Sequence, residues 1–157
     1  KLSNGEKLPT LEKYLKQGKK SKQVKLIVEI KPAKTPELED EMVIKTLKMI
    51  RDKSLENQCE FISFSLHLCK EIKRQNPKAI VQYLAGDLSP LEIKNAGIDG
   101  LDYHYSVFLD KHPDWILEAK KLGLITNVWT VNDEVIFKKL ADLGVGFVTT
   151  NVPDVLK

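Results

Sequence analysis

The chain has 157 residues, of which 42% are apolar and 30% are charged, and its formal net charge is +3. These values are typical of one ordinary globular domain and exclude a disordered or fibrous chain. The weak positive charge comes partly from lysines between positions 16 and 25 and fits a solvated helix end. A nucleic-acid surface would need a denser basic stripe with interleaved aromatic residues, so no nucleic-acid partner is expected.

The start of the chain and its cysteines give little further information on class. No apolar stretch approaches the length that crosses a bilayer, so no membrane span is expected. Residues 1–5 (KLSNG) contain neither a signal-peptide core nor an initiating Met, and the native start is expected to lie elsewhere. Cys59 and Cys69 are too few for a disulfide framework and are expected as free thiols.

The predicted elements alternate between strands and helices. A helix is expected at about residues 11–17, and then a short apolar run, a polar loop and a helix-period segment recur six times. The apolar runs are rich in β-branched and aromatic residues, as strands are. They cover residues 26–30, 61–65, 79–84, 100–105, 125–131 and 145–150.

The helix boundaries carry clear signals. Thr35 followed by Pro36 is typical of an N-cap and a first helical position, and Ser89 with Glu92 has the spacing of a capping box. Three later helices are expected to stop at glycines, which suit the left-handed residue after a helix end. These glycines are Gly97, Gly123 and Gly144.

Strands that alternate with helices pair in parallel, either in an open doubly wound sheet or in a (β/α)₈ barrel. On the first strand, Leu26, Val28 and Ile30 face one side. Glu29 and Lys31 face the other side at the carboxyl end. The mouth of a barrel can hold two such charges, whereas a helix would cover them in an open sheet.

Polarity thus favours an α/β fold of the (β/α)₈ TIM-barrel type. Six βα units cannot close an eight-stranded barrel, so the first two strands are expected to be missing from the front. Residues 1–157 are accordingly interpreted as the C-terminal part of a single barrel domain. By alternation, Tyr103 and Tyr105 are expected on the lumen face and His104 on the helix-covered face.

Several segments together resemble the glycerophosphodiester phosphodiesterase family. Their order and spacing are specific in combination, although each alone is weak, and they cover essentially the whole chain. The segments are LPTLE (8–12), IVEIK (27–31), YLAGDLSP (83–90), DYHY (102–105), NVWTVN (127–132) and TTNVPD (149–154).

The resemblance implies a barrel that hydrolyses glycerophosphodiesters to glycerol 3-phosphate and an alcohol. The family uses Mg²⁺ or Ca²⁺ held by carboxylates, with two histidines as general acid and base. Glu29 matches the metal-ligating glutamate of the family's third strand, Lys31 the lysine that contacts phosphate, and Trp129 the aromatic residue beside the substrate. Without the resemblance, Glu29 and Lys31 could equally form a simple ion pair, and Trp129 could be barrel core.

The chain departs from the family in its histidines and remaining carboxylates. The family's His-Arg-Gly, Glu-x-Asp and His-Asp segments have no counterpart here. His67, His104 and His112 stand in none of those contexts, so no catalytic residue is assigned within this fragment. The fragment alone is therefore expected to be inactive.

Two other interpretations stay open. The chain could be a non-catalytic binding or assembly fragment, because raw strand edges favour self-association or pairing with a missing N-terminal segment. It could also be a related lipid phosphodiesterase that acts on sphingomyelin or phosphoinositides. Bacterial members of this type are often exported, which favours a periplasmic or secreted location and leaves a cytoplasmic one open.

Overall fold

The computed structural model describes residue 3 and residues 5–156. Residues 1, 2, 4 and 157, which include part of the opening segment and both ends of the expected domain, lie outside the described residues. The strands are β1 (Leu26–Glu29), β2 (Cys59–Ser63), β3 (Val81–Tyr83), β4 (Gly100–His104), β5 (Ile125–Trp129) and β6 (Phe147–Val148). The helices are α1 (Leu11–Gly18), α2 (Pro36–Asp52), α3 (Leu66–Gln75), α4 (Pro90–Asn95), α5 (Trp115–Lys121) and α6 (Glu134–Asp142), with a π-helix at Val107–Lys111.

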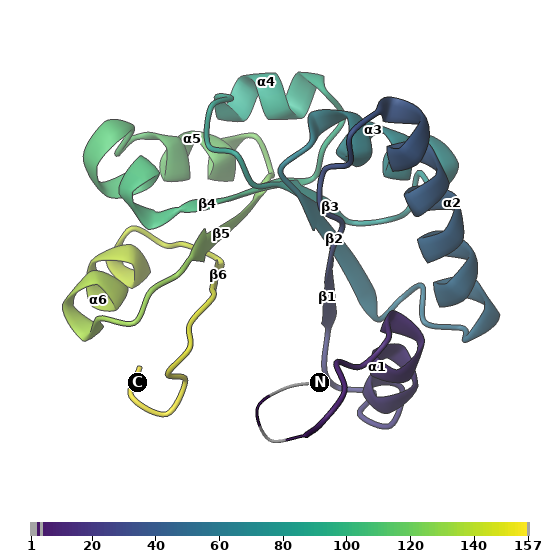
Figure 1. Cartoon of the computed structure of the whole chain (residues 1–157). Helices are drawn as coiled ribbons and strands as arrows, with labels where there is room; N and C mark the ends of the chain where they lie inside the picture. Colours follow the sequence, from purple (N-terminus) through teal and green to yellow (C-terminus); the bar gives the residue numbers. More distant parts are fainter. Residues whose placement is uncertain (1–2, 4, 157) are drawn as a thin grey trace.

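The six strands form one parallel sheet in the order β1-β2-β3-β4-β5-β6. Figure 1 shows that this sheet curves into an arc, with helices α2 to α5 against its convex side. We call this arrangement the half-barrel and its concave side the inner face. A doubly wound sheet reverses its strand order at a switch point, and this sheet does not. The strand order therefore confirms the barrel-type expectation over the open sheet.

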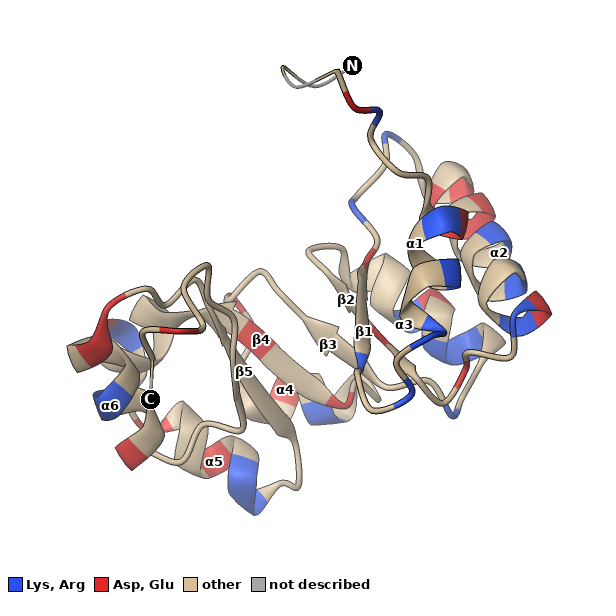
Figure 2. Ribbon diagram, turned by 90° about the horizontal axis from the view of Figure 1, so that it is seen from below, with Lys and Arg blue, Asp and Glu red and all other residues tan. Residues whose placement is uncertain are grey.

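The main core lies between the convex side of the sheet and the helices. Leu26, Val28 and Ile30 are buried there, whereas Ile27 and Glu29 point to the inner face and are more exposed. The alternation expected for the first strand is thus confirmed. Figure 2 shows most charged residues on helices and loops, with the strands largely free of charge and Asp102 as the acidic position on β4.

Side-chain caps fix the helix starts as expected. Thr35 Oγ1 accepts a hydrogen bond from the Leu38 amide, and Ser89 with Glu92 forms a complete capping box. The chain passes through positive φ at Gly97, Gly123 and Gly144, each two residues after the end of one of the three later helices.

Gly100 is required for the close approach of β4 to β5. A Cβ atom at this position would lie 2.5 Å from the Ile125 carbonyl oxygen. Because real side chains do not tolerate such a contact, any larger residue would push β4 away from β5.

The orientation expected for β4 is wrong. Asp102 pairs with Asn127 and His104 with Trp129, so Asp102 and His104 face inward while Tyr103 lies under the helices. There the Tyr103 ring stacks on Phe108, and its hydroxyl donates to the Leu88 carbonyl at 2.9 Å. The phenol fits this side because it finds an acceptor there.

The state of the two cysteines and the length of the described helices agree with what the sequence predicts. Cys59 and Cys69 are both free and buried, as expected. Burial raises the thiol pKa to about 11 for Cys59 and about 12 for Cys69. Among the described helices, none is both long and apolar enough to cross a membrane.

Candidate active site

The inner face carries a cleft of about 270 Å³ at the carboxyl end of the strands. Because all six strands are parallel, their carboxyl ends and the polar groups there meet at this one edge. We call it the carboxyl-end cleft. It is lined by Glu29, Lys31, Ile62, Phe64, Leu84, Asp102, Trp129, Thr130 and Thr149.

Glu29 and Lys31 form an ion pair in this cleft. Lys31 Nζ lies 2.9 Å from Glu29 Oε1. The Glu29 side chain is 33% exposed and that of Lys31 75% exposed. An ion pair this exposed contributes little to stability, so both groups can exchange partners when an anion or a cation arrives.

Trp129 forms one wall of the cleft. Its indole Nε1 donates to the Asp102 carbonyl at 2.9 Å, and its ring lies edge-on to Phe64 with centroids 5.8 Å apart. The ring of His104, on β4, lies against the indole with the two ring centroids 5.2 Å apart. The hydrogen bond and these ring contacts hold the indole upright, so the wall exists before any ligand binds.

Asp102 lies at the floor of the cleft and was not among the site residues predicted from the sequence. The residue is 2% exposed, and its Oδ1 atom has no hydrogen-bond partner among the described residues. Burial, with a smaller contribution from the negative charge of Glu29, raises its pKa to about 7. A carboxyl group within an otherwise apolar strand is the signal that could have identified it.

A second buried carboxylate, Glu39, ties the two loops at the cleft mouth. Its Oε1 accepts from the Ala33 amide at 3.1 Å, and its Oε2 accepts from the Ser65 hydroxyl at 2.8 Å. Ala33 follows Lys31 after β1, and Ser65 caps α3 after β2. Glu39 therefore fixes the backbone that carries Lys31.

The other residues weighed in the sequence lie apart from the cleft or at its border. Tyr105 follows the end of β4 and does not line the cleft. His67 Nε2 lies 2.7 Å from Asp40 Oδ1 on the helix side. The ring of His112 stacks on Trp115. His104 lies next to Trp129 with its Nδ1 on the Ser106 hydroxyl at 2.7 Å.

The donor set suits part of a cation site. Mg²⁺ and Ca²⁺ bind about six or more oxygen ligands, and carboxylates are their usual protein ligands. Glu29 and Asp102 both line the cleft. No group of three or more His, Cys, Asp or Glu side chains within residues 3 and 5–156 is placed to hold a metal. The described residues thus supply at most some ligands, and what they offer by themselves is binding and orientation.

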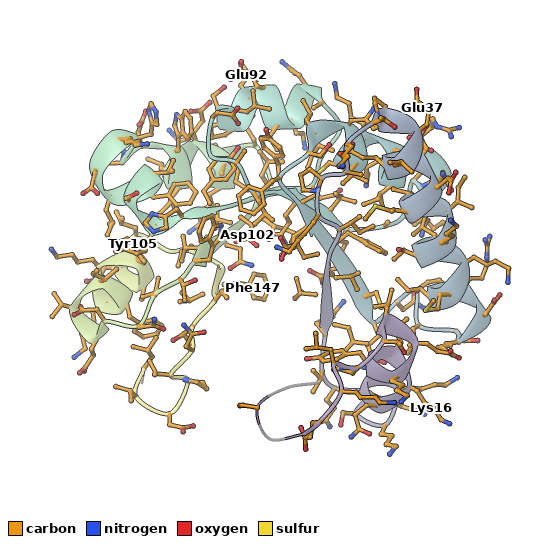
Figure 3. All side chains as sticks on the ribbon, in the orientation of Figure 1. Lys16, Glu37, Glu92, Asp102, Tyr105 and Phe147 are labelled. Carbon is orange, nitrogen blue, oxygen red and sulfur yellow. The ribbon has the colours of Figure 1, made fainter. Side chains whose placement is uncertain are left out.

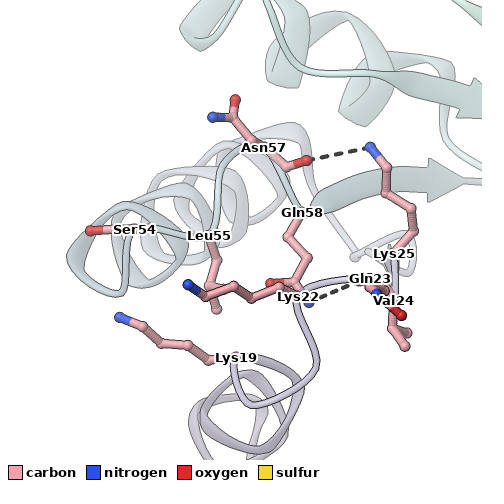
Figure 4. A pocket seen from close by; sticks show the side chains of 9 residues that line it. All are labelled: Lys19, Lys22, Gln23, Val24, Lys25, Ser54, Leu55, Asn57 and Gln58. Carbon is pink, nitrogen blue, oxygen red and sulfur yellow. Dashed lines mark hydrogen bonds between the residues drawn. The ribbon is translucent and has the colours of Figure 1, made fainter.

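A second hollow, also of about 270 Å³, lies at the amino end of the strands. Figure 4 shows its lining residues, which come from the segments before β1 and β2. Lys25 Nζ donates to the Asn57 carbonyl and pairs with Glu60, and Lys19 Nζ donates to the Lys53 carbonyl. These lysines tie loops together, so the hollow has a structural explanation. We call it the amino-end hollow.

A family model described as the glycerophosphoryl diester phosphodiesterase family matches residues 1–155. The chain belongs to this family. A search of curated proteins returned no match. The resemblance noted in the sequence is thereby confirmed, and the half-barrel can be compared with solved structures of the family.

A glycerophosphodiester phosphodiesterase from Parabacteroides distasonis is 47% identical to the chain, with a TM-score of 0.93 over 97% of this chain and 63% of that one. A putative glycerophosphoryl diester phosphodiesterase from Silicibacter pomeroyi is 27% identical, with a TM-score of 0.80, and the match covers 90% of this chain and 52% of that one. A phosphodiesterase from Oleispira antarctica, solved with its product sn-glycerol-3-phosphate, shares the fold at 22% identity and a TM-score of 0.78, over 92% and 58% of the two chains. The 157 residues thus span about three fifths of the length of the Parabacteroides protein.

Proposed function

We propose that the protein hydrolyses glycerophosphodiesters to glycerol 3-phosphate and an alcohol, with the help of a divalent cation. The observation that supports this most directly is the convergence of Glu29, Lys31 and Trp129 on one cleft at the carboxyl end of the strands. Active sites of barrel enzymes are built at this end. Family membership supports the same reaction class.

The side chains of the cleft suit an anionic substrate. A phosphodiester carries a negative charge, and Lys31 Nζ offers a mobile positive charge once it leaves Glu29. Trp129 and Phe64 offer an apolar wall for the carbon atoms of the substrate. Glu29 would hold Mg²⁺ or Ca²⁺ as one ligand among several, and such a cation, when bound, neutralises charge on the phosphate.

We further propose that residues 1–157 by themselves do not turn over substrate. Proton transfer needs an acid and a base within hydrogen-bond reach of the reacting atoms. His67 bonds to Asp40 and His112 stacks on Trp115, so neither is placed for this work. His104 borders the cleft, but its Nδ1 is engaged with the Ser106 hydroxyl. The six-stranded sheet also ends in β1 and β6, and such edges favour pairing with further strands, from another segment or from a second copy.

Release of glycerol 3-phosphate from glycerophosphocholine, glycerophosphoethanolamine and a lysolipid, with and without added Mg²⁺ or Ca²⁺, tests the reaction in the full-length protein. The variant is Glu29→Gln, and its control is Glu41→Gln, which removes a carboxylate from another exposed Lys–Glu pair. We expect cation-dependent release that falls about 100-fold or more in Glu29→Gln and is unchanged in Glu41→Gln. Equal activity in both variants would contradict the role of Glu29, and a preference for lysolipid would favour a lipid phosphodiesterase.

The second proposal is tested with the isolated 157-residue polypeptide. We expect no release above that of its own Glu29→Gln variant, and sedimentation velocity should show association at micromolar concentration. Turnover by a monomeric polypeptide would refute both expectations.

A further inference from the structure

Three buried acceptor oxygens of the inner face have no hydrogen-bond partner among the described residues. They are Gln82 Oε1, Asp102 Oδ1 and Asn127 Oδ1. Their side chains come from the adjacent strands β3, β4 and β5, and each residue is at most 6% exposed. Buried polar groups nearly always have partners in native proteins, because an unmet one costs about 1–3 kcal/mol. Three neighbouring exceptions therefore leave acceptor capacity on the inner face that a ligand with donors can use.

The register places these three side chains at neighbouring positions of the inner face, and of the three Asp102 alone lines the cleft. Asp102 pairs directly with Asn127 across β4 and β5, and Gln82 pairs with Gly100, two residues earlier on β4. Asp102 itself lines the carboxyl-end cleft beside Glu29 and Trp129. Figure 3 shows Asp102 and Phe147 directed to the concave side, whereas Glu37 and Glu92 lie on the outer helices.

The donors already in the cleft are engaged elsewhere. Lys31 Nζ bonds to Glu29, and the indole Nε1 of Trp129 donates to the backbone carbonyl of Asp102 and not to its carboxylate. The Ala33 amide and the Ser65 hydroxyl on this side bond to Glu39. The protein thus supports the Asp102 backbone and leaves its carboxyl group available.

We propose that Asp102 binds hydroxyl groups of the glycerol part of the substrate, with Asn127 as the neighbouring acceptor, and so determines specificity for a glycerol-bearing phosphate ester. The inference rests on the proposed function, because it assumes that phosphate lies at Lys31. A vicinal or terminal hydroxyl can donate to the unpartnered oxygens of Asp102 and Asn127. Above the raised pKa of Asp102, where the carboxylate is charged, such a hydrogen bond is also stronger than one between neutral groups.

Such a site favours ligands that carry hydroxyl groups over ligands that lack them. A ligand without hydroxyls leaves the buried carboxyl group unpaired, so a site built to accept hydroxyl donors rejects the deoxygenated analogue. A single hydrogen bond of this kind corresponds to a preference of about tenfold or more. Lys31, in contrast, cannot separate two ligands that carry the same phosphate.

The test compares sn-glycerol 3-phosphate with n-propyl phosphate, which has the same carbon skeleton and no hydroxyl groups. Calorimetric titration of the full-length protein gives the affinity for each, and their ratio is the readout. We expect the wild type to prefer glycerol 3-phosphate about tenfold or more. Asp102→Leu should bring the ratio to within about twofold, and Asp102→Asn, which keeps the volume, should lower it about threefold. The control Asp110→Leu removes an exposed carboxylate and should leave the ratio unchanged.

The outcomes separate the inference from the proposed function. Lys31→Met should weaken both ligands by the same factor and keep their ratio. A wild type that binds neither ligand overturns the proposed function and the inference with it. A wild type that binds both equally, or an Asp102→Asn variant with the full wild-type ratio, overturns the inference alone. Loss of Mg²⁺ or Ca²⁺ affinity in Asp102→Asn with an unchanged ratio also overturns it, since Asp102 would then be a cation ligand.

Discussion

The two ends of the half-barrel hold hollows of the same volume, about 270 Å³, yet they differ in how their polar groups are used. At the amino end, Gln58 and the lysines bond to loop carbonyls. At the carboxyl end, Asp102 keeps an oxygen without a partner among the described residues. Volume therefore does not distinguish the two ends, whereas unmet hydrogen-bonding capacity does.

The difference has a topological cause. Parallel strands place all their amino ends on one side, where the segments from each helix to the next strand have to be fastened, and all their carboxyl ends on the other. At the amino end the side chain of Gln58 reaches the carbonyls of Gly18, Ser21 and Val24. Substitutions at the two ends should consequently affect different properties, and four predictions follow this contrast.

The largest expected effect is on activity at the carboxyl end. Lys31→Met should lower kcat/KM for glycerophosphocholine about 1,000-fold, as loss of a charge on phosphate does, with little change in the free energy of unfolding. The matched substitution at the amino end, Lys25→Met, removes the pair with Glu60 and should cost about 1 kcal/mol of stability while activity is kept. Steady-state kinetics and urea unfolding of both variants measure the contrast. A large loss of activity in Lys25→Met would contradict the proposed difference between the two ends of the sheet.

The second prediction concerns the pH dependence contributed by Asp102. Its pKa is raised from 3.8 in the unfolded chain to about 7 in the fold, so between these values the folded form holds a proton that the unfolded form releases. Rising pH therefore favours unfolding, by about 1.4 kcal/mol per pH unit and on the order of 4 kcal/mol in total. Relative to Asp102→Asn, the wild type should lose stability from pH 4 to pH 7 and then stay level.

Urea unfolding of the two proteins at matched pH values measures this difference. Both proteins carry the same exposed carboxylates, such as Glu41 and Asp52, so the contribution of these groups cancels in the comparison. Their lowered pKa values make stability rise with pH, in the opposite sense to Asp102 and at lower pH. A constant gap between the two proteins across this range would show that the Asp102 side chain is not buried without a partner.

The third prediction is a stability effect at the amino end. Gln58→Leu removes the amide that donates to Gly18, Ser21 and Val24 and should cost about 2 kcal/mol, with unchanged kcat/KM. Gln23→Leu, an exposed glutamine of the same hollow, is the matched control and should change stability by less than about 0.5 kcal/mol. If Gln58→Leu instead altered catalysis at full stability, the amino-end hollow would not be merely structural.

The smallest effect is expected for Lys22→Met. Lys22 is exposed in the amino-end hollow, and its removal should change stability by less than about 0.5 kcal/mol and phosphate binding not at all. Titration with inorganic phosphate and thermal unfolding provide the two measurements. Weaker phosphate binding in this variant would indicate an anion site at the amino end of the sheet and would contradict the proposed site at the carboxyl end.

The sequence was sufficient for the strand order and for β1, but not for β4. In β1, three aliphatic residues alternate with Glu29 and Lys31, so only one orientation keeps both charges out of the core. In β4, rings occupy both alternating sets, and either Tyr103 or His104 could face the helices by composition. The choice depends on the Leu88 carbonyl, an acceptor 15 residues earlier in the chain that only tertiary structure brings near.

The same limit applies to the floor of the cleft. Glu29, Lys31 and Trp129 could be singled out because they lie at strand ends within recognisable segments. Asp102 lies inside a strand, and its meaning depends on its pairing with Asn127 on β5. Register between strands is fixed by side-chain packing over the whole sheet, which no local pattern encodes. The roles assigned to the three predicted residues stay predictions until the variants are measured.

The bridge made by Glu39 has a consequence for the entropy of binding. Since both of its oxygens are used, the loop after β1 cannot swing without also disturbing the start of α3. An arriving anion then meets a lysine whose main chain is already ordered, and only the four methylene groups of its side chain lose freedom. We expect that loop to open only when the first turn of α3 frays. The amide hydrogens of the two segments should therefore exchange at similar rates.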